Sequence, residues 1–426
     1  MTDIRPFAGI RYNPARVPDL NRVVTQPYDK VNEKMHAAYM AKDEHNFVRL
    51  ILPQGDDKYR LSADTCRRWL ADGVLKKDPA PAAYVYHEQF KHAGRELVRK
   101  AFVGCIRVEE FEKGTVLPHE FTLKKARADR DSLLRATRMD YEQIFMLYSD
   151  PGFTVDRLLA PAGAPRMQAT DEYGVVHKMW AVTDPKRLAA LHAEMSQKQL
   201  LIADGHHRYE TALQFRQELE KANPNLDKDA ACRFKLTAFV NMADPGLVIL
   251  PTHRLLAGLA GFDSGRMVAT LSSAFAVTPV PDEKAEAALE KDKSGHAFIL
   301  YTGKGKSHLL VLKDPSLLDR YVAADKSRDY KALDVVVLHA GIIEGLLGIA
   351  REKLEAHVKY ERYWNDTLNR VNSGEAQCAF FMNPTRPEQV QRLAERGERM
   401  PQKSTDFYPK LISGFVFSDA RDGVKL

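Results

Sequence analysis

A strand pattern that runs through a glycine directly into a helix pattern constrains this fold more than any other part of the sequence. Residues 201–211 have the sequence Leu-Ile-Ala-Asp-Gly-His-His-Arg-Tyr-Glu-Thr. Gly205 permits a sharp turn because it has no Cβ, and the helix pattern begins at His206. The free N–H groups and the dipole of a helix start favour an anion. The sequence therefore predicts a strand–turn–helix unit with an anion site at the turn.

Apolar residues recur at helical spacing from Tyr209 to Leu219, which indicates a packed helix after the turn. Taken singly, Asp204 can be a helix cap and Arg208 can pair with a glutamate on a solvated face. Capping alone does not explain the whole run of side chains at the turn. The candidate phosphate-binding residues here are Asp204, Gly205, His206, His207 and Arg208.

The chain has 426 residues, enough for two or three domains with cores of their own. Its four cysteines are far apart and form no Cys-x-x-Cys pair, so neither a disulfide framework nor a cysteine zinc site is indicated. The net charge of +6 is dispersed along the chain, which suits an anionic small molecule and does not favour nucleic acid.

The N-terminal residues lack the basic and apolar regions of a secretion signal. The most apolar stretch, Val335 to Ala350, is interrupted by His339 and Glu344. We therefore expect no membrane span and a cytoplasmic location. The oligomeric state stays open.

The pattern predicts a mixed α+β fold with three regions: an α+β part over 1–150, a strand–helix core over 165–260 that carries the glycine turn, and an α+β region over 261–426. A loop with Pro and Gly over 150–164 separates the first two. The expected helices are Glu33–Ala41, Thr65–Gly73 and Leu333–Ile349. The expected strands are Asn46–Pro53, Ala83–Phe90, Leu97–Val108, Leu247–Leu250, Ala297–Thr302, Ser307–Lys313 and Ile412–Phe417.

Other polar blocks are further candidates for the same site. His119, Glu120 and Thr122 offer a base, a carboxylate and a hydroxyl, while Arg130 and Arg135 could clamp a phosphate or carboxylate. The alternative for this block is a solvated helix surface, because charge runs usually have that role.

A His253-Arg254 pair follows an apolar strand, and functional groups often gather at such strand ends. Near the C-terminus, Lys403, Ser404 and Thr405 could touch phosphate or form a polar turn. In the N-terminal part, Asp29 precedes a helix and can be its cap.

Familiar nucleotide and hydrolase motifs are missing: the sequence has no P-loop, no Rossmann glycine fingerprint and no Gly-x-Ser-x-Gly elbow. A histidine-based metal site stays open, although no His-x-x-x-His pair fixes two ligands on one helix face. Its candidate ligands are His119, His206, His207, His253, Glu120 and Asp204.

Taken together, the ordered blocks resemble the bacterial and archaeal family known as domain of unknown function 1015, over nearly the whole chain. The blocks are Pro27-Tyr28-Asp29, Asn46 to Leu50, His119 to Thr122, Asp204 to Tyr209, Pro251 to Arg254 and Lys403 to Thr405. That family resembles more distantly the superfamily of ParB, sulfiredoxin and free-serine kinases.

The resemblance implies a ParB/sulfiredoxin-like nucleotide-binding core in which Gly205, His207 and Arg208 grip nucleotide phosphates. It also implies a general base near the first helix, at Asp29 or Glu33. The sulfiredoxin cysteine has no counterpart because position 206 is His, and no ParB-type helix-turn-helix is evident. Sulfinic-acid repair and ParB-type DNA binding are therefore not expected.

We expect a nucleotide-dependent phosphotransferase, a small-molecule kinase that acts on a hydroxylated acid such as free serine. It would use Mg²⁺ with ATP or ADP, the metal being held by Asp204 or Glu120. The candidate bases are Asp29, Glu120 and His206, which the sequence does not rank. The alternatives are a metal-dependent phosphoester or nucleotide hydrolase, and a ParB-like nucleotide-sensing or nucleic-acid-binding protein.

If one site is formed, distant blocks must converge on the glycine turn. We expect His119, Glu120, Arg130, Arg135, His253 and Arg254 to line the same cleft as residues 204–208.

Overall fold

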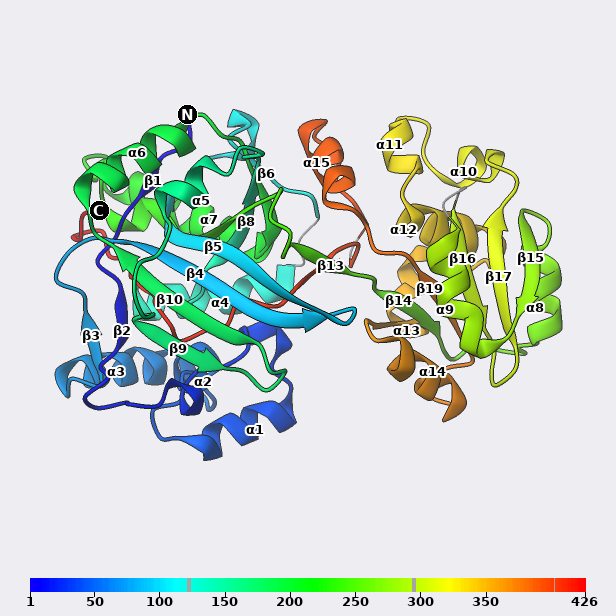
Figure 1. Ribbon diagram of the computed structural model, residues 1–426, viewed down its shortest axis with the longest axis horizontal. Coiled ribbons are helices and arrows are strands. Elements are labelled where there is room, and N and C mark those ends of the chain that lie inside the picture. Colours follow the sequence, from blue (N-terminus) through cyan, green and yellow to red (C-terminus); the bar gives the residue numbers. More distant parts are fainter. Residues whose placement is uncertain (121–123, 293–295, 402) are drawn as a thin grey trace. The chain divides into compact units, whose positions relative to one another are not determined.

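The computed structural model describes residues 1–120, 124–292, 296–401 and 403–426, and confirms a mixed α+β fold (Figure 1). The chain forms two compact units. Unit 1 comprises Met1–Pro118, Thr122–Val248 and Phe407–Leu426, and unit 2 comprises His119–Phe121 and Ile249–Asp406. Most of the stretch 1–150 and residues 165–248 thus belong to one unit, to which residues 407–426 return, whereas residues 249–260 belong to the other.

The main sheet of unit 1 has nine strands within the described residues, in the order β6-β11-β8-β12-β5-β4-β10-β9, with β1 paired to β5. The strands are β1 (Ile4–Arg5), β4 (Ala83–His92), β5 (Arg95–Arg107), β6 (Val116–Leu117), β8 (Ile144–Tyr148), β9 (Met167–Thr170), β10 (Val176–Val182), β11 (Leu200–Asp204) and β12 (Phe234–Asn241). Two small pairs accompany it: β2 (Ile10–Tyr12) with β3 (Leu75–Lys77), and β7 (Met139–Asp140) with β21 (Ser418–Asp419). The predicted hairpin of β4 and β5 is confirmed.

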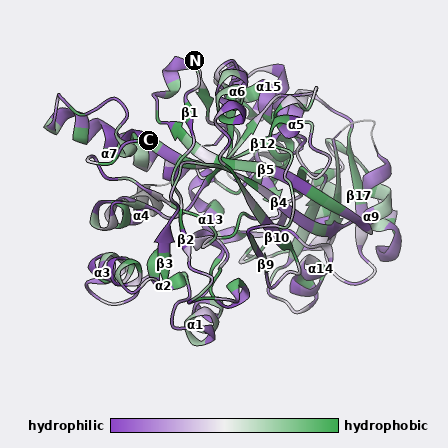
Figure 2. Cartoon of the chain, turned by 60° about the vertical axis from the view of Figure 1, so that its left-hand side comes forward, coloured by the Kyte–Doolittle hydropathy of each residue, from purple (hydrophilic) through white to green (hydrophobic). Residues whose placement is uncertain are grey.

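The helices of unit 1 are α1 (Glu33–Lys42), α2 (Val48–Ile51), α3 (Lys58–Ala71), α4 (Lys124–Thr137), α5 (Thr154–Leu158), α6 (Pro185–Ser196) and α7 (His206–Ala222), with 3-10 turns η1 (Leu20–Arg22), η2 (Tyr28–Lys30), η3 (Phe111–Lys113) and η4 (Ala231–Arg233). Residues of α5, α6 and α7 pack on Phe102, Met146 and Phe239 of the sheet. Figure 2 shows the corresponding contrast: the central strands are largely hydrophobic, whereas α3 and α7 carry many hydrophilic residues. The hydrophobic effect on this face therefore holds α7, and with it the glycine turn, against the sheet.

Two of the expected strands are wrong. Asn46–Pro53 was expected to be extended but contains α2. The Asn46 side chain accepts a bond from the Val48 amide at 3.1 Å and donates to the Arg22 carbonyl at 2.8 Å, which stabilises a turn. Residues 412–417 make only isolated bridges, such as Thr25 with Ser413, instead of a regular strand.

The sheet of unit 2 is antiparallel, in the order β15-β17-β16-β19-β14-β18. Its strands are β14 (His253–Leu256), β15 (Phe275–Val280), β16 (Ala297–Tyr301), β17 (Ser307–Leu312), β18 (Val358–Glu361) and β19 (Cys378–Met382). The predicted pair of β16 and β17 is confirmed. In sequence, β13 (Val248–Leu250) and β20 (Asp406–Tyr408) lie where the chain passes from one unit to the other.

The helices of unit 2 are α8 (Ser264–Leu271), α9 (Asp282–Lys291), α10 (Ser316–Tyr321), α11 (Arg328–Lys331), α12 (Asp334–Val336), the π-helix η5 (Val337–Leu346), the 3-10 turn η6 (Arg351–Lys353), α13 (Leu354–His357), α14 (Trp364–Asn372) and α15 (Pro387–Glu395). The expected helix over Leu333–Ile349 is confirmed as helical, but most of it is π-helix. No helix in the described ranges is both long and apolar enough to cross a membrane.

A charge cluster lies fully inside unit 1, between β4, β5 and β10. The Arg99 Nε donates to the Glu88 carboxylate at 2.8 Å, and the Arg99 Nη2 donates to the Pro409 carbonyl at 2.6 Å. His177 lies 3.8 Å from Glu88 and 3.4 Å from Asp171. Burial raises the pKa of Glu88, although Arg99 and His177 oppose the shift. The cluster therefore joins the middle of the sheet to the C-terminal segment.

We predict that Arg99→Leu destabilises unit 1 by roughly 3–5 kcal/mol, because Glu88 would stay buried without its partner. The double variant Glu88→Leu/Arg99→Leu should lose much less, since no charge of the pair is stranded. Urea unfolding gives the free energies, and hydrogen exchange of β4 and β5 locates the change. Equal losses in the two variants would contradict the prediction.

Candidate functional site

The predicted strand–glycine–helix unit is confirmed: β11 ends at Asp204 and α7 begins at His206. Gly205 lies between them with φ +97°, in the left-handed region. An ideal Cβ at this position would lie 3.1 Å from both Nε and Nη2 of Arg208. Glycine is therefore required at this turn for two reasons: its positive φ angle and the room it leaves for the Arg208 guanidinium.

Arg208 is fixed in this position by the backbone and by charge. Its side chain is 10% exposed, and its Nη2 lies 3.8 Å from the Asp204 carboxylate. Its Nη1 donates to the Gln143 carbonyl at 2.6 Å. Burial alone would lower the pKa of Arg208, but Asp204, Glu142 and other neighbours raise it. The guanidinium is therefore a permanent, preoriented cation at the helix start.

Asp204 lies among cations. The Lys410 ammonium is 3.6 Å from its carboxylate. Burial would raise the pKa of Asp204, but the charges of Lys410, Arg208 and Lys30 hold it well below the ordinary range. Asp204 is therefore ionised at neutral pH, and the turn collects positive charge from three separate segments.

The 3-10 turn η2 is tied to the same place. The Tyr28 amide donates to Glu142 at 3.0 Å, and the Tyr28 ring lies 4.1 Å from the guanidinium carbon of Arg130. Burial raises the pKa of Tyr28 to about 12. The charge of Asp29, the next residue, contributes to the raised pKa of Arg208. Asp29 therefore lies within electrostatic range of the turn.

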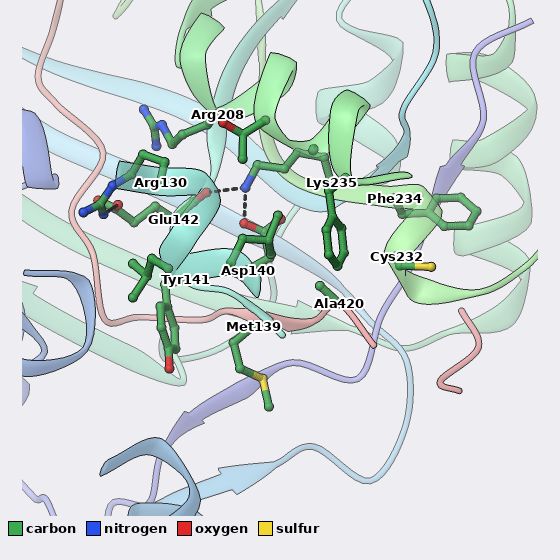
Figure 3. Close-up of a pocket in the computed structure, with 15 residues that line it drawn as sticks. Arg130, Met139, Asp140, Tyr141, Glu142, Arg208, Cys232, Phe234, Lys235 and Ala420 are labelled. Atoms are coloured by element: carbon green, nitrogen blue, oxygen red, sulfur yellow. Dashed lines mark hydrogen bonds and ion pairs between the residues drawn. The ribbon is translucent and has the colours of Figure 1, made fainter. Parts of the chain in front are cut away.

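A cavity of about 50 Å³ lies beside Arg208 in unit 1 (Figure 3). Arg130, Glu142 and Lys235 line it together with apolar side chains of α4 and α7. Lys235 contacts Asp140 and donates to the Glu142 carbonyl at 2.9 Å. Burial lowers the pKa of Lys235 despite Asp140. The cavity is large enough for water but not for an organic ligand.

Unit 1 brings the glycine turn, Asp29 and Arg130 together. His206 is buried in the first turn of α7 and adds to the charges that lower the Asp204 pKa, and His207 follows it. Arg135 instead binds Asp131 at 2.6 Å and Glu218 at 2.7 Å, which satisfies its guanidinium between α4 and α7. Thr122 lies outside the described residues.

Unit 2 holds the other predicted site residues. His119 lies 3.0 Å from the Thr405 hydroxyl, and Glu120 forms a bridge with Met400. Arg254 donates to the Lys403 carbonyl at 3.0 Å, and the Ser404 carbonyl accepts a bond from Thr385 at 2.9 Å. The blocks around residues 119, 254 and 403 are thus neighbours within this unit.

His253 has the surroundings of a core histidine. Its ring lies 4.7 Å from the ring of Phe381 and 5.8 Å from that of Trp364. Burial and the neighbouring Arg254 lower its pKa to about 3, so the ring is neutral.

Three residues of the site were missed by sequence reasoning: Lys30, Glu142 and Lys410. Lys410 lies five residues after Thr405, the last residue of the C-terminal block that was expected to touch phosphate, and this proximity in sequence was the one signal available for it. Glu142 stands in no recognisable motif. Within the described ranges, no three His, Cys, Asp or Glu residues are grouped to hold a metal ion.

A family model described as "Protein of unknown function (DUF1015)" matches residues 4–336. Curated proteins gave no match. Among solved structures, a conserved hypothetical protein from Pyrococcus furiosus is 16% identical, with TM-score 0.35 over 72% of this chain and 92% of that one. Free serine kinase in complex with AMP is 15% identical, with TM-score 0.34 over 72% and 88%. SbnI with a C-terminal truncation, from Staphylococcus aureus, is 11% identical, with TM-score 0.33 over 72% and 84%. TM-scores this low do not establish a shared fold.

We predict that Gly205→Ala lowers the free energy of unfolding by more than Gly163→Ala and also weakens phosphate binding. Both glycines have positive φ, and strain of this kind costs roughly 1–3 kcal/mol. Gly163 has φ +71° with nothing near its ideal Cβ, whereas the Cβ at Gly205 would displace Arg208. Urea unfolding and titration with inorganic phosphate measure the two effects. Equal losses with unchanged phosphate binding would contradict the prediction.

Proposed function

This chain belongs to the DUF1015 family, and for it we propose a nucleotide-dependent phosphotransferase that acts on a small hydroxylated acid, with free serine as the first acceptor to test. We place the nucleotide phosphates at the Gly205 turn of unit 1, in a ParB/sulfiredoxin-like core. The observation that carries the proposal is the Arg208 guanidinium held over a left-handed glycine at the start of a long helix.

The turn combines the groups that bind phosphate. The first amides of α7 and the helix dipole favour an anion at this end. Arg208 adds a fork of N–H donors that matches phosphate oxygens. Lys410 and Lys30 add charge around Asp204. Several cations at one helix start suit a polyphosphate better than a single carboxylate.

Phosphoryl transfer requires positioning and charge neutralisation more than covalent catalysis, which this set of groups can supply. The ionised carboxylate of Asp204 fits Mg²⁺, a cation that prefers carboxylate and phosphate oxygens. Bound there, Mg²⁺ would neutralise charge on the transferred phosphoryl group. Glu120, the other expected metal ligand, belongs to unit 2 and is not needed for this assignment.

The acceptor requires a cation for its carboxylate and a base for its hydroxyl, next to the terminal phosphate. Asp29 and Lys30 are adjacent in η2, and both influence the pKa values of the turn residues. His206 in the first turn of α7 is the second candidate base of unit 1. Glu120, the third candidate base named from the sequence, belongs to unit 2.

We predict that Arg208→Ala weakens ATP and ADP binding by roughly 1.5–3 kcal/mol, the range for a charged hydrogen bond. Arg208→Lys should lose less because it keeps the charge. The matched control is Arg67→Ala on α3, whose side chain is 74% exposed and pairs with Asp64 on the same helix. Calorimetric titration measures affinity, and circular dichroism checks the fold. Unchanged affinity in folded Arg208→Ala would reject the phosphate assignment.

We also predict that replacing the true base lowers turnover by about 10²–10⁴-fold with nucleotide affinity nearly unchanged, as expected for loss of general-base catalysis. The variants are Asp29→Asn, His206→Gln and Glu120→Gln, and Asp64→Asn on the surface of α3 is the control. The assay is phosphorus NMR with ATP or ADP, Mg²⁺ and a panel of hydroxy acids that includes serine.

Two outcomes of this assay would overturn the proposal. Nucleotide hydrolysis with no phosphorylated acceptor across the panel would favour a hydrolase. Nucleotide binding without any turnover would favour a sensor.

A further inference from the structure

Unit 2 contains a cavity of about 530 Å³, within the size range of small-molecule sites. The π-helix η5 forms one wall. The other lining residues include members of α10, α11, η6, α13 and β18 and of the segment 399–403. All of its lining residues belong to unit 2, and none is used in the function proposed above for unit 1.

The π-helix gives this wall its pattern. Leu347 donates its amide to the Ile342 carbonyl at 2.9 Å, five residues back. This spacing brings His339 and Glu344 to the same side, and both line the cavity. An ideal Cβ at Gly345 of η5 would lie 2.6 Å from the Tyr321 side chain of α10, so glycine permits the close packing of η5 against α10. Segments of π-helix are rare and occur frequently at functional sites.

A buried cation lies behind the wall. Arg254 on β14 is 1% exposed. Among the described residues its hydrogen bonds go to neutral groups: the His339 ring at 3.0 Å, the Lys403 carbonyl at 3.0 Å, the Thr252 carbonyl and the Met382 sulfur. Burial lowers the pKa of Arg254 to about 10, with Tyr360 and Glu120 opposing the shift. A buried charge without an ion-pair partner is costly, and a nearby anion would offset that cost.

His339 lies between Arg254 and the cavity: it accepts a hydrogen bond from Arg254 and lines the cavity wall. Its side chain is 6% exposed, and burial with the charges of Arg254 and Arg351 keeps its pKa well below the ordinary value. Because Arg254 donates to Nε2, that nitrogen is the acceptor and the proton of the neutral ring is on Nδ1. Within the described part of the chain, no hydrogen-bond partner is found for Nδ1. His339 is therefore a buried donor in a cavity wall.

The remaining charged residues of the wall favour an anion. The cations are Lys326, Arg351, Arg399 and Lys403, and the anions are Glu344 and Glu355. The charge of Arg351 opposes the burial that raises the pKa of Glu344. Positive charge therefore exceeds negative charge around the cavity, before Arg254 behind the wall is included.

We propose that this cavity binds a small organic anion, whose phosphate or carboxylate oxygens contact Arg351 and the Nδ1–H of His339 while Arg254 supplies buried positive charge behind them. The site lies apart from the Gly205 turn in the chain and does not depend on the activity of unit 1. Phosphate esters and polycarboxylates share the required oxygen chemistry, and the experiment separates them.

The test is equilibrium dialysis of the full chain against radiolabelled AMP and, separately, radiolabelled citrate. The wild type is compared with Arg208→Ala, Arg351→Ala and the double variant, and two further variants serve as controls. We expect one of the probes to bind a site that Arg208→Ala leaves intact and that Arg351→Ala weakens at least tenfold. Arg351→Lys should retain part of the affinity, and Lys359→Ala on the exposed side of β18 is the control.

Hydrogen exchange gives the location. In the Arg208→Ala chain, the bound probe should slow exchange of the amides in η5. If neither probe binds, or if binding is the same in folded Arg351→Ala, the proposal is wrong. If Arg208→Ala abolishes binding and no probe binds to unit 2, this inference is wrong but the proposed function still stands. Loss of probe binding in Arg351→Ala alone supports this inference and counts against the proposed function.

Discussion

The buried ion pair of Glu88 and Arg99 is the interaction on which the rest of unit 1 depends. The charge of Arg99 is balanced by Glu88, and the Arg99 Nη2 also donates to the Pro409 carbonyl at 2.6 Å. The next residue, Lys410, lies 3.6 Å from Asp204 at the glycine turn. Because both charges of the pair are inaccessible to water, neither can exchange its partner for solvent without a large penalty. The pair thus holds the segment that brings the Lys410 ammonium to the glycine turn.

The part of the site that could be predicted is the part that is local in sequence. Gly205 and Arg208 are close neighbours, and the turn geometry follows from the absence of a Cβ. Lys410 and Glu142 reach the site through tertiary contacts, which the periodicity of the sequence does not predict. The segment Asn46–Pro53 shows the same limit for the fold: its apolar pattern fits a strand, but side-chain bonds of Asn46 and burial of the segment stabilise a helical turn.

Arg99 and Arg254 are the two most deeply buried arginines in the described part of the chain, and the cost of burying each charge is met differently. Arg99 has a carboxylate at hydrogen-bond distance, so its environment is electrically complete and it has a structural role. Arg254 is surrounded by neutral acceptors, among them the ring of His339. A buried cation that is bonded only to neutral groups costs stability, and such costly arrangements are found most often at functional sites. This contrast is the reason that we assign a structural role to Arg99 and propose a binding role for Arg254. The sequence singled out Arg254, in its pair with His253, but gave no sign that Arg99 is buried in an ion pair.

The return of the chain to unit 1 at residues 407–426 has a consequence for biosynthesis. Residues 249–406 form nearly all of unit 2 and leave the ribosome before that last segment. Domains generally fold as units in the order of their synthesis, so unit 2 can become compact while unit 1 still lacks its final segment. Until residues 409 and 410 are synthesised, Arg99 lacks the Pro409 carbonyl and Asp204 lacks the Lys410 ammonium. The glycine turn, to which we assign phosphate binding, thus receives Lys410 only after residues 249–406 of unit 2 have been synthesised.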